Sequence, residues 1–456
     1  MVRDLTVGNP TKLIVRFCLP LMAGNLFQQF YNLVDSMVVG RFVGTSALSA
    51  VGSVGSLNFL VIGSVIGLCT GFAIPVSQCF GAGDLVKMRR FIANLIYLAA
   101  LLGAGVTLLT VFGSRTLLTL LHTPEDILSD AYTYICVIFL GIPATILYNT
   151  VASLFRAVGD SKTPLYFLIF SSIVNIGLDF LFVLEFGMGV LGVAIATVIA
   201  QALAGLTELV YLLGRFQILR LQRADMHPDS ECCRKLLYAG LPMALQFSIT
   251  AIGSVMLQSC VNELGSAMIA AITIAGKAQL ILVLPAETIG LTMATYCGQN
   301  LGAKKLDRIT VGVRRSMMMA FLYAACAMLL NRFCAKYMLL LFVKADETAV
   351  LSLGVRFLHT AMWFYPILVI IFVLRNALQG MGFSFHAMTA GAFELAARGI
   401  MGYVFVRRFG FSAACFANPV AWFAADVFLV PMYVYVMHRF RTDSRFLQQR
   451  TKKAFE

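Results

Sequence analysis

The chain has 456 residues, of which 59% are hydrophobic and only 12% are charged. A soluble globular protein carries about 25% charged residues, so the composition excludes a water-soluble enzyme and predicts an all-α integral membrane protein in contact with the lipid bilayer. The formal net charge is +13. The basic residues lie in the breaks between apolar segments, which indicates membrane topology and not nucleic-acid binding.

Twelve apolar stretches are each long enough to cross a bilayer core about 30 Å thick as a helix. Short polar breaks separate them, and no soluble domain is expected. The predicted transmembrane helices are 13–39, 54–79, 91–112, 130–153, 164–184, 190–213, 237–262, 268–297, 313–333, 352–378, 386–406 and 414–437.

The basic residues predict how the chain is oriented in the cell membrane. With both termini in the cytoplasm, the inside segments hold 24 Lys and Arg and the outside loops hold seven. This asymmetry favours cytoplasmic termini, because cytoplasmic loops carry the excess of positive charge. The other four, Lys277, Arg356, Arg375 and Arg398, fall inside or at the edges of predicted helices.

The two halves of the sequence resemble one another at an offset of 221 to 223 residues. Leu19-Pro20 pairs with Leu241-Pro242, Gly159 with Gly382, and Phe186-Gly187 with Phe409-Gly410. The repeat predicts two parallel six-helix lobes related by a pseudo-two-fold axis along the membrane normal, an arrangement suited to alternating access. The predicted segments are a cytoplasmic arm (1–12), an N-lobe (13–214), a basic cytoplasmic linker (215–235), a C-lobe (236–438) and a cytoplasmic tail (439–456).

The first predicted helix carries five polar residues spaced by three and four, which places them on one face. They are Asn25, Gln28, Gln29, Asn32 and Asp35. Interhelical hydrogen bonding explains amides at such positions, whereas an acid inside the membrane favours a functional role. We expect this face, with Tyr31, to line a substrate cavity and Asp35 to bind the coupling ion.

The fifth predicted helix places a second acid inside the membrane. Asn175 and Asp179 are four residues apart, and Thr197 and Asn149 on neighbouring helices are expected to complete a polar cluster. Two carboxyl groups removed from water do not readily both ionise. The cluster is therefore predicted to bind a proton, or a sodium ion held by oxygen ligands, and no other metal.

The second half lacks central acids in its first and fourth helices. Gln246, Thr250, Ser254 and Gln258 form a mild polar stripe, which with Met256 and Lys277 is assigned to the substrate cavity. Internal ion pairs or a plain packing role are both open for Lys277, Glu287, Arg375, Glu394 and Arg398, although Glu394 and Arg398 have the favourable i,i+4 spacing. Ion coupling is thus expected mainly in the first lobe.

Several motifs resemble the multidrug and toxic compound extrusion (MATE) family over nearly the whole chain. They are Leu19-Pro20 with Leu33-Val-Asp-Ser-Met-Val-Val-Gly40, Phe155-Arg-Ala-Val-Gly-Asp160, Asn175-Ile-Gly-Leu-Asp179 with Ala194-Ile-Ala-Thr197, and Gln299-Asn-Leu-Gly-Ala-Lys-Lys305. The resemblance implies efflux of organic cations, drugs or metabolites by antiport against protons or sodium. We also expect no cofactor and a monomeric protein. The branch resembling the DNA-damage-inducible type would place the coupling site at Asp35, Asn175, Asp179 and Thr197.

Two other functions remain as alternatives. A lipid-linked precursor flippase would favour a more basic central cavity than this chain offers. A membrane-embedded enzyme would need a catalytic cluster near the membrane interface, and His122 and Asp126 are one residue short of the acyltransferase His-x4-Asp spacing. ATP as the direct energy source is not expected, because the chain has no Gly-x4-Gly-Lys-Ser/Thr motif.

Overall fold

The computed structural model describes residues 3–121 and 123–443. In this part of the chain the regular structure is entirely helical, from α1 to α16 with short 3₁₀ and π-helical segments between them. The all-α prediction is therefore confirmed. His122 and residues 444–456, which make up most of the predicted tail, lie outside the described residues.

The described chain forms two compact units. Unit 1 contains residues 3–4 and Leu19–Ala244, and unit 2 contains Leu5–Cys18 and the described chain from Leu245 onward. The boundaries therefore fall inside two helices, α1 (Pro10–Val38) and α9 (Ser230–Val261), close to their internal prolines Pro20 and Pro242. The predicted lobes begin at residues 13 and 236, near the starts of the same two helices.

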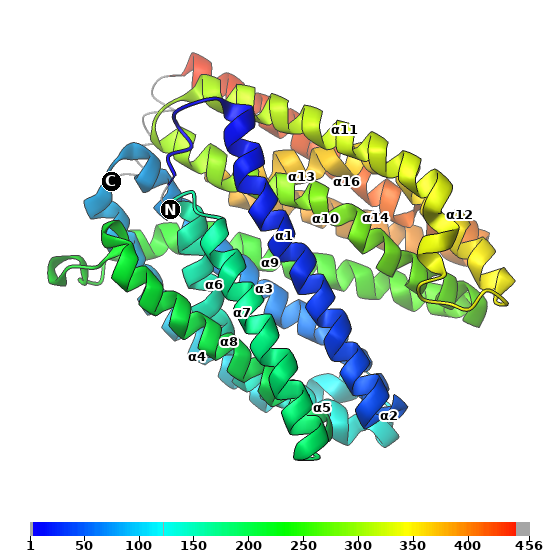
Figure 1. The fold of residues 1–456 in the computed structure, drawn as a ribbon. Helices are drawn as coiled ribbons and strands as arrows, with labels where there is room; N and C mark the ends of the chain where they lie inside the picture. The colour runs from blue at the N-terminus through cyan, green and yellow to red at the C-terminus, as the bar shows by residue number, and fades with distance from the viewer. Residues whose placement is uncertain (1–2, 122, 444–456) are drawn as a thin grey trace. The chain divides into compact units, whose positions relative to one another are not determined.

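Unit 1 is built around α8, which packs on α5, α6 and α7, while α3 packs on α4 and α6 (Figure 1). Besides its parts of α1 and α9, its elements are η1 (Val39–Val43), α2 (Thr45–Ser53), α3 (Gly55–Ala82), α4 (Leu85–Leu120), α5 (Glu125–Leu140), α6 (Ile142–Ala157), α7 (Lys162–Phe180), η2 (Leu181–Glu185), α8 (Gly189–Arg215), η3 (Gln217–Leu219) and η4 (Arg223–Asp225).

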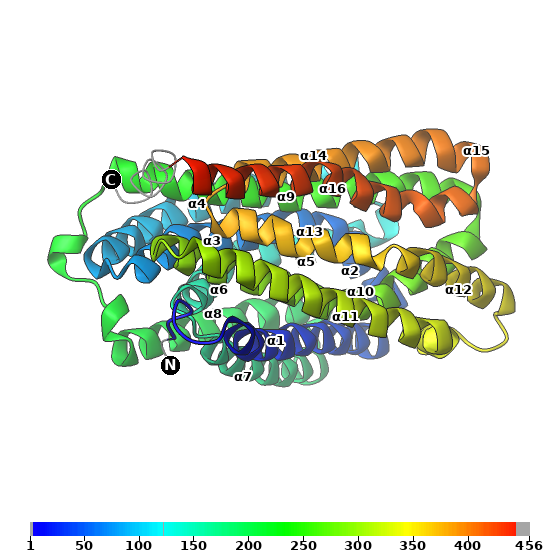
Figure 2. The same cartoon turned by 90° about the horizontal axis from the view of Figure 1, so that it is seen from above.

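Unit 2 is built around α10, which packs on α11, α12 and α13, while α16 packs on α12, α13 and α14 (Figure 2). Besides its parts of α1 and α9, its elements are η5 (Asn262–Leu264), α10 (Ser266–Gly302), α11 (Leu306–Leu339), α12 (Thr348–Trp363), α13 (Tyr365–Gly380), α14 (Ser384–Ile400), η6 (Met401–Val406), α15 (Arg407–Phe409) and α16 (Phe411–Thr442).

Two of the predicted spans are broken helices. The pair α5 and α6 bends by 47°, and the pair α12 and α13 bends by 54°. A proline stands at the second position after each break, Pro143 and Pro366, and proline both lacks an N–H donor and disfavours helix at the residue before it. These prolines are 223 residues apart, so the bend recurs with the repeat.

Among the described residues, eight helices are long and apolar enough to cross a membrane, and ten if each bent pair counts as one span. The predicted spans 13–39 and 386–406 correspond to α1 and to α14 with η6. The amide side chains of α1 lower its hydropathy, and α14 has only 17 residues before the π-helical segment begins.

Two of the sequence motifs have local structural roles. Gln299 and Asn300 hydrogen-bond the backbone of Leu5 at 2.9 and 3.3 Å and so hold the N-terminal arm within unit 2. Asp160 accepts hydrogen bonds from the backbone of Lys162 and Thr163 at 3.0 and 3.1 Å and caps the start of α7.

The segment between α8 and α9 is fixed to α4 within unit 1. Arg89 forms an ion pair with Asp225 at 2.9 Å, and Asn94 accepts a hydrogen bond from the Asp229 backbone at 2.8 Å. Asp229 in turn accepts from the N–H groups of Glu231 and Cys232. Burial raises the pKa of Asp229, but these backbone donors outweigh it and leave the pKa below its usual value.

Candidate functional site

The candidate site in unit 1 begins with two acids that lie one turn or less before π-helical segments. Asp35 lies in the last turn of α1 before η1, and Asp179 lies at the end of α7 before η2. π-Helical turns in membrane and soluble helices occur frequently at functional sites.

The structure brings Asp35 and Asp179 together, although 144 residues separate them in the chain. Each carboxyl group interacts electrostatically with the other, and Tyr31 and Tyr134 lie beside both. Asp179 is fully buried. The sequence analysis did not include Tyr134 in this cluster.

Two of the other expected residues join the same cluster. Asn175, 1% exposed, donates a hydrogen bond from Nδ2 to Thr197 Oγ1 at 3.4 Å, and Thr197 donates to the Val193 carbonyl at 3.0 Å. Asn149 instead donates to the carbonyl of Thr145, one turn earlier in its own helix, at 2.8 Å.

The carboxyl oxygens of this cluster are short of hydrogen-bond donors. Within the described part of the chain, both oxygens of Asp179, Oδ1 of Asp35 and Oδ1 of Asn175 are buried and accept no hydrogen bond. An ionised carboxylate is only an acceptor, so two neighbouring carboxylates can be joined only by a proton on one of them or by a cation between them. The arrangement suits uptake of a proton, or of a sodium ion with oxygen ligands.

The remaining polar residues of α1 differ in exposure. Asn25 is half-buried, whereas Gln28, Gln29 and Asn32 are exposed. In α9, the polar stripe is largely bonded to its own helix, since Thr250 donates to the carbonyl of Gln246 and Ser254 to that of Thr250, each at 3.0 Å. Gln258 donates to Asn262 at 2.8 Å.

Met256 and Lys277 occupy different settings in unit 2. A Cβ added at Gly399 would lie 3.3 Å from Met256 Cε, so Met256 lies against α14. Lys277 is exposed on α10. It is ten residues from Glu287, which is about 15 Å along a helix, so these two residues do not pair with each other.

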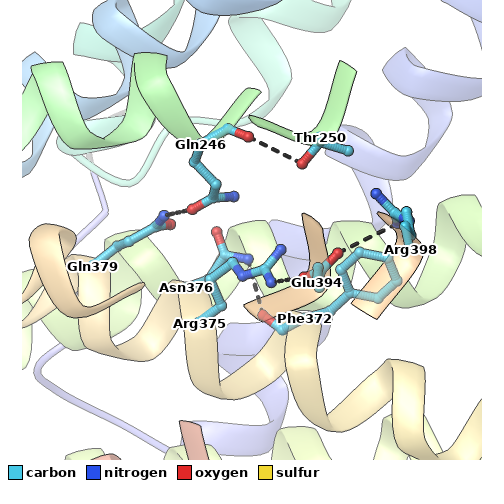
Figure 3. Close-up of polar contacts among 8 residues, drawn as sticks. All are labelled: Gln246, Thr250, Phe372, Arg375, Asn376, Gln379, Glu394 and Arg398. Atoms are coloured by element: carbon cyan, nitrogen blue, oxygen red, sulfur yellow. Dashed lines mark hydrogen bonds and ion pairs between the residues drawn. The ribbon is translucent and has the colours of Figure 1, made fainter. Parts of the chain in front are cut away.

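Unit 2 contains a buried network of charges between α13 and α14 (Figure 3). Glu394 accepts a hydrogen bond from Arg375 and a second from Arg398, the latter at 3.4 Å. All three side chains are less than 10% exposed. Of the two alternatives left open for Arg375, Glu394 and Arg398, the structure shows ion pairs.

The same view shows how polar groups of α9 approach this network. Gln379 donates to Gln246 Oε1 at 2.7 Å, and Asn376 donates to the Phe372 carbonyl at 2.9 Å (Figure 3). A Cβ added at Gly253 would lie 3.1 Å from Arg398 Nη1, so the missing side chain leaves room for the guanidinium group. Nε and Nη1 of Arg398 have no acceptor among the described residues.

Two buried acids were missed by the sequence analysis. Glu208 on α8 is fully buried beside Arg156 and Tyr148 in unit 1, and Asp426 on α16 is 8% exposed beside Arg375 and Glu394 in unit 2. None of their carboxylate oxygens has a donor in the described chain. The available signal was the presence of a single acid within an apolar run, which is already unusual inside a membrane.

Comparison with known proteins identifies the class to which this fold and buried polar site belong. The family model described as MatE matches residues 20–181 and 242–404, one segment in each half of the chain. The protein is a multi-pass membrane transporter and not an enzyme. It belongs to the MATE family of multidrug and toxic compound extrusion transporters.

Two curated relatives and one solved structure illustrate the likeness. The "Probable multidrug resistance protein YpnP" of Bacillus subtilis (strain 168) is 30% identical, with 83% of this chain and 84% of the relative covered. The "Probable multidrug resistance protein YoeA" of the same strain is also 30% identical, covering 76% of each chain. A structure titled "Outward-facing conformation of a multidrug resistance MATE family transporter of the MOP superfamily" is 21% identical with a TM-score of 0.90, covering 96% of this chain and 98% of that chain.

Proposed function

We propose that this protein is a secondary active exporter that exchanges organic cations, drugs or metabolites for protons or sodium ions by alternating access. The observation that carries the proposal is the pair Asp35 and Asp179 in unit 1, whose buried oxygens lack donors within the described residues. Such a pair binds a cation in one conformation of the protein. It releases the cation when a second conformation changes the surroundings of the two carboxyl groups.

In the proposed mechanism, a cation enters at Asp35 and Asp179 from outside and neutralises the pair. Tyr31 lies beside both acids, and Asn175 and Thr197 complete the polar cluster around them. Neutralisation favours a different arrangement of α1, which carries Asp35 in unit 1 and continues beyond Pro20 into residues assigned to unit 2. A bend at Pro20 links ion binding to substrate release, because proline removes a hydrogen bond from the helix.

We further propose twelve transmembrane spans, obtained by counting each bent pair once and adding α1 and α14 with η6. The two matches of one family model, in residues 20–181 and 242–404, support two parallel lobes. The excess of basic residues in alternate loops supports cytoplasmic termini in the cell membrane. The protein is proposed to act as a monomer. We also propose that it belongs to the branch resembling the DNA-damage-inducible type, which the presence of Asp35, Asn175, Asp179 and Thr197 supports.

The proposed substrate class rests on the relatives, two of which are named as multidrug resistance proteins. An acidic cluster in unit 1 is compatible with positively charged substrates. The flippase alternative is not favoured, since these names and the family model concern multidrug transport.

A reconstituted transport assay tests the proposal. Full-length protein in lipid vesicles should accumulate or expel a fluorescent organic cation when a pH gradient or a sodium gradient is imposed, and the effective gradient identifies the coupling ion. Asp35→Asn and Asp179→Asn should each abolish gradient-driven transport, whereas Asp130→Asn, which alters an exposed acid of α5, should not. Gradient-driven transport at the wild-type rate in both site variants would contradict the proposal.

A further inference from the structure

We propose that unit 2 has a binding site for one negatively charged glycerophospholipid, in an apolar groove on the surface of α14, η6 and α16. The inference concerns residues that the proposed transport mechanism does not use. Its test is therefore independent of the proposed coupling site.

The groove has a volume of about 720 Å³, within the size range of small-molecule sites. Its lining includes Ala397 and Ile400 from α14, Phe405 from η6, and Phe416 and Val420 from α16. Every lining side chain is apolar except Ser412. Phe405 and Phe416 are about 40% exposed, so the groove opens to its surroundings. A hydrocarbon chain fits this chemistry.

Two guanidinium groups contact residues that line the groove. Arg356 on α12 donates a hydrogen bond from Nη2 to Ser412 Oγ at 2.9 Å, and the Arg408 guanidinium lies 5.6 Å from the ring centre of Phe409. Both arginines are exposed, and neither forms an ion pair with a carboxylate in the described chain. α12 and α15 lie at the same end of unit 2 (Figure 2). The groove residues that the two arginines contact, Ser412 and Phe409, are three positions apart in the chain, so both charges border the same part of the groove.

Arg407 provides an internal contrast. Its guanidinium is bound to Glu263 by hydrogen bonds of 2.8 and 3.1 Å, so its charge is already neutralised. Arg356 and Arg408 keep a net positive charge beside an apolar groove. The ligand that complements both features is an anionic head group attached to an apolar chain.

The internal repeat shows that this combination belongs to unit 2 alone. The pairing of Phe409-Gly410 with Phe186-Gly187 aligns Arg408 with Glu185. Unit 1 therefore carries an acid at the corresponding position, which is the last residue of its own π-helical segment η2. An organic cation would be repelled by the two arginines, which excludes the proposed transport substrate as the occupant of this groove.

The test is native mass spectrometry of the full-length protein after incubation with equal amounts of phosphatidylglycerol and phosphatidylcholine. One phosphatidylglycerol should be retained in preference to phosphatidylcholine by about tenfold or more, since each arginine near a head group favours anionic lipid by roughly fivefold. R356Q/R408Q should reduce this preference to about one. A397F should lower retention of both lipids, because the larger side chain fills the groove.

Two controls separate the groove from general effects of charge and folding. R115Q removes one charge from an exposed arginine of unit 1 and should keep the wild-type preference. Each variant is first required to elute as a single species in gel filtration. The proposal is overturned if the wild type retains both lipids equally, if R356Q/R408Q keeps the preference, or if A397F retains phosphatidylglycerol like the wild type.

Discussion

Arg375 on α13 and Arg398 on α14 share one buried carboxylate, that of Glu394. The three charges leave a net positive charge in unit 2, beside the buried carboxyl group of Asp426. In unit 1 the relation is different, because Asp35 and Asp179 face each other with no arginine among their electrostatic neighbours. The acid pair of unit 1 and the Arg375–Glu394–Arg398 network of unit 2 therefore have formal charges of opposite sign.

We predict that Glu394→Gln lowers the free energy of unfolding by about 3 kcal/mol, because removing one partner leaves buried charges unpaired. Thermal unfolding of the purified protein measures the loss. Glu263→Gln is the matched control, since its ion pair with Arg407 is about half exposed and exposed pairs contribute little. Equal melting temperatures for Glu394→Gln and the wild type would show that the network does not stabilise unit 2.

Substitution of the buried acids Glu208 and Asp426 should have the opposite effect on stability. Their carboxylate oxygens have no donor in the described chain, so an ionised form would be costly. Glu208→Gln and Asp426→Asn remove that cost while keeping the shape, and we expect unchanged or higher melting temperatures at pH 7. A loss of more than about 2 kcal/mol in either variant would mean that the charged form is paired in the folded protein.

The helical class could be predicted because it follows from apolar length. Helical spacing placed Asp35 and Asp179 each on a polar face of its own helix, and the cost of an acid inside a membrane made their proximity the expected arrangement. The break between α5 and α6, at Gly141, was not predicted although Pro143 gave a local signal. An apolar stretch long enough for one span has the same composition whether or not it contains a bend. The contact between Arg375 and Glu394 depends on how α13 is rotated against α14, which no local pattern defines. Tyr134 was missed for the same reason, because its role arises only from neighbours on α1 and α7.

The pH dependence of stability should reveal the cap formed by Asp229 at the start of α9. Its pKa is lowered in the folded state by backbone donors, so the stabilisation is present above the unfolded pKa of about 3.9 and is lost as the pH falls. Asp229→Ala should lower the free energy of unfolding by about 1 kcal/mol at pH 7 and by less near pH 3, where the charge-dependent part of the cap is being lost. Asp229→Asn keeps an oxygen acceptor but not the negative charge, so at pH 7 it should lose only part of the stability that Asp229→Ala loses. If Asp229→Ala lowered the free energy of unfolding by the same amount at pH 7 and pH 3, this role would be contradicted.

The packing of α3 against α9 in unit 1 depends on two glycines in direct contact. A Cβ added at Gly71 would lie 2.5 Å from Gly240 Cα and 2.8 Å from the Ala239 carbonyl oxygen, and these backbone atoms cannot move aside as a side chain would. Small residues allow transmembrane helices to approach this closely. We therefore expect Gly71→Ala to lower the free energy of unfolding by about 2 kcal/mol, the cost typical of overpacking.

Gly105 is the matched control for this prediction, because it lies inside α4 and an added Cβ would meet no atom within 4 Å. Alanine is favoured over glycine inside a helix by roughly 0.5–1 kcal/mol, so Gly105→Ala should leave the protein equally stable or slightly more stable. Unfolding by heat or denaturant in detergent compares the two variants. If Gly71→Ala matched Gly105→Ala, the first part of α9 would not lie as close to α3 as its contacts with Gly71 require.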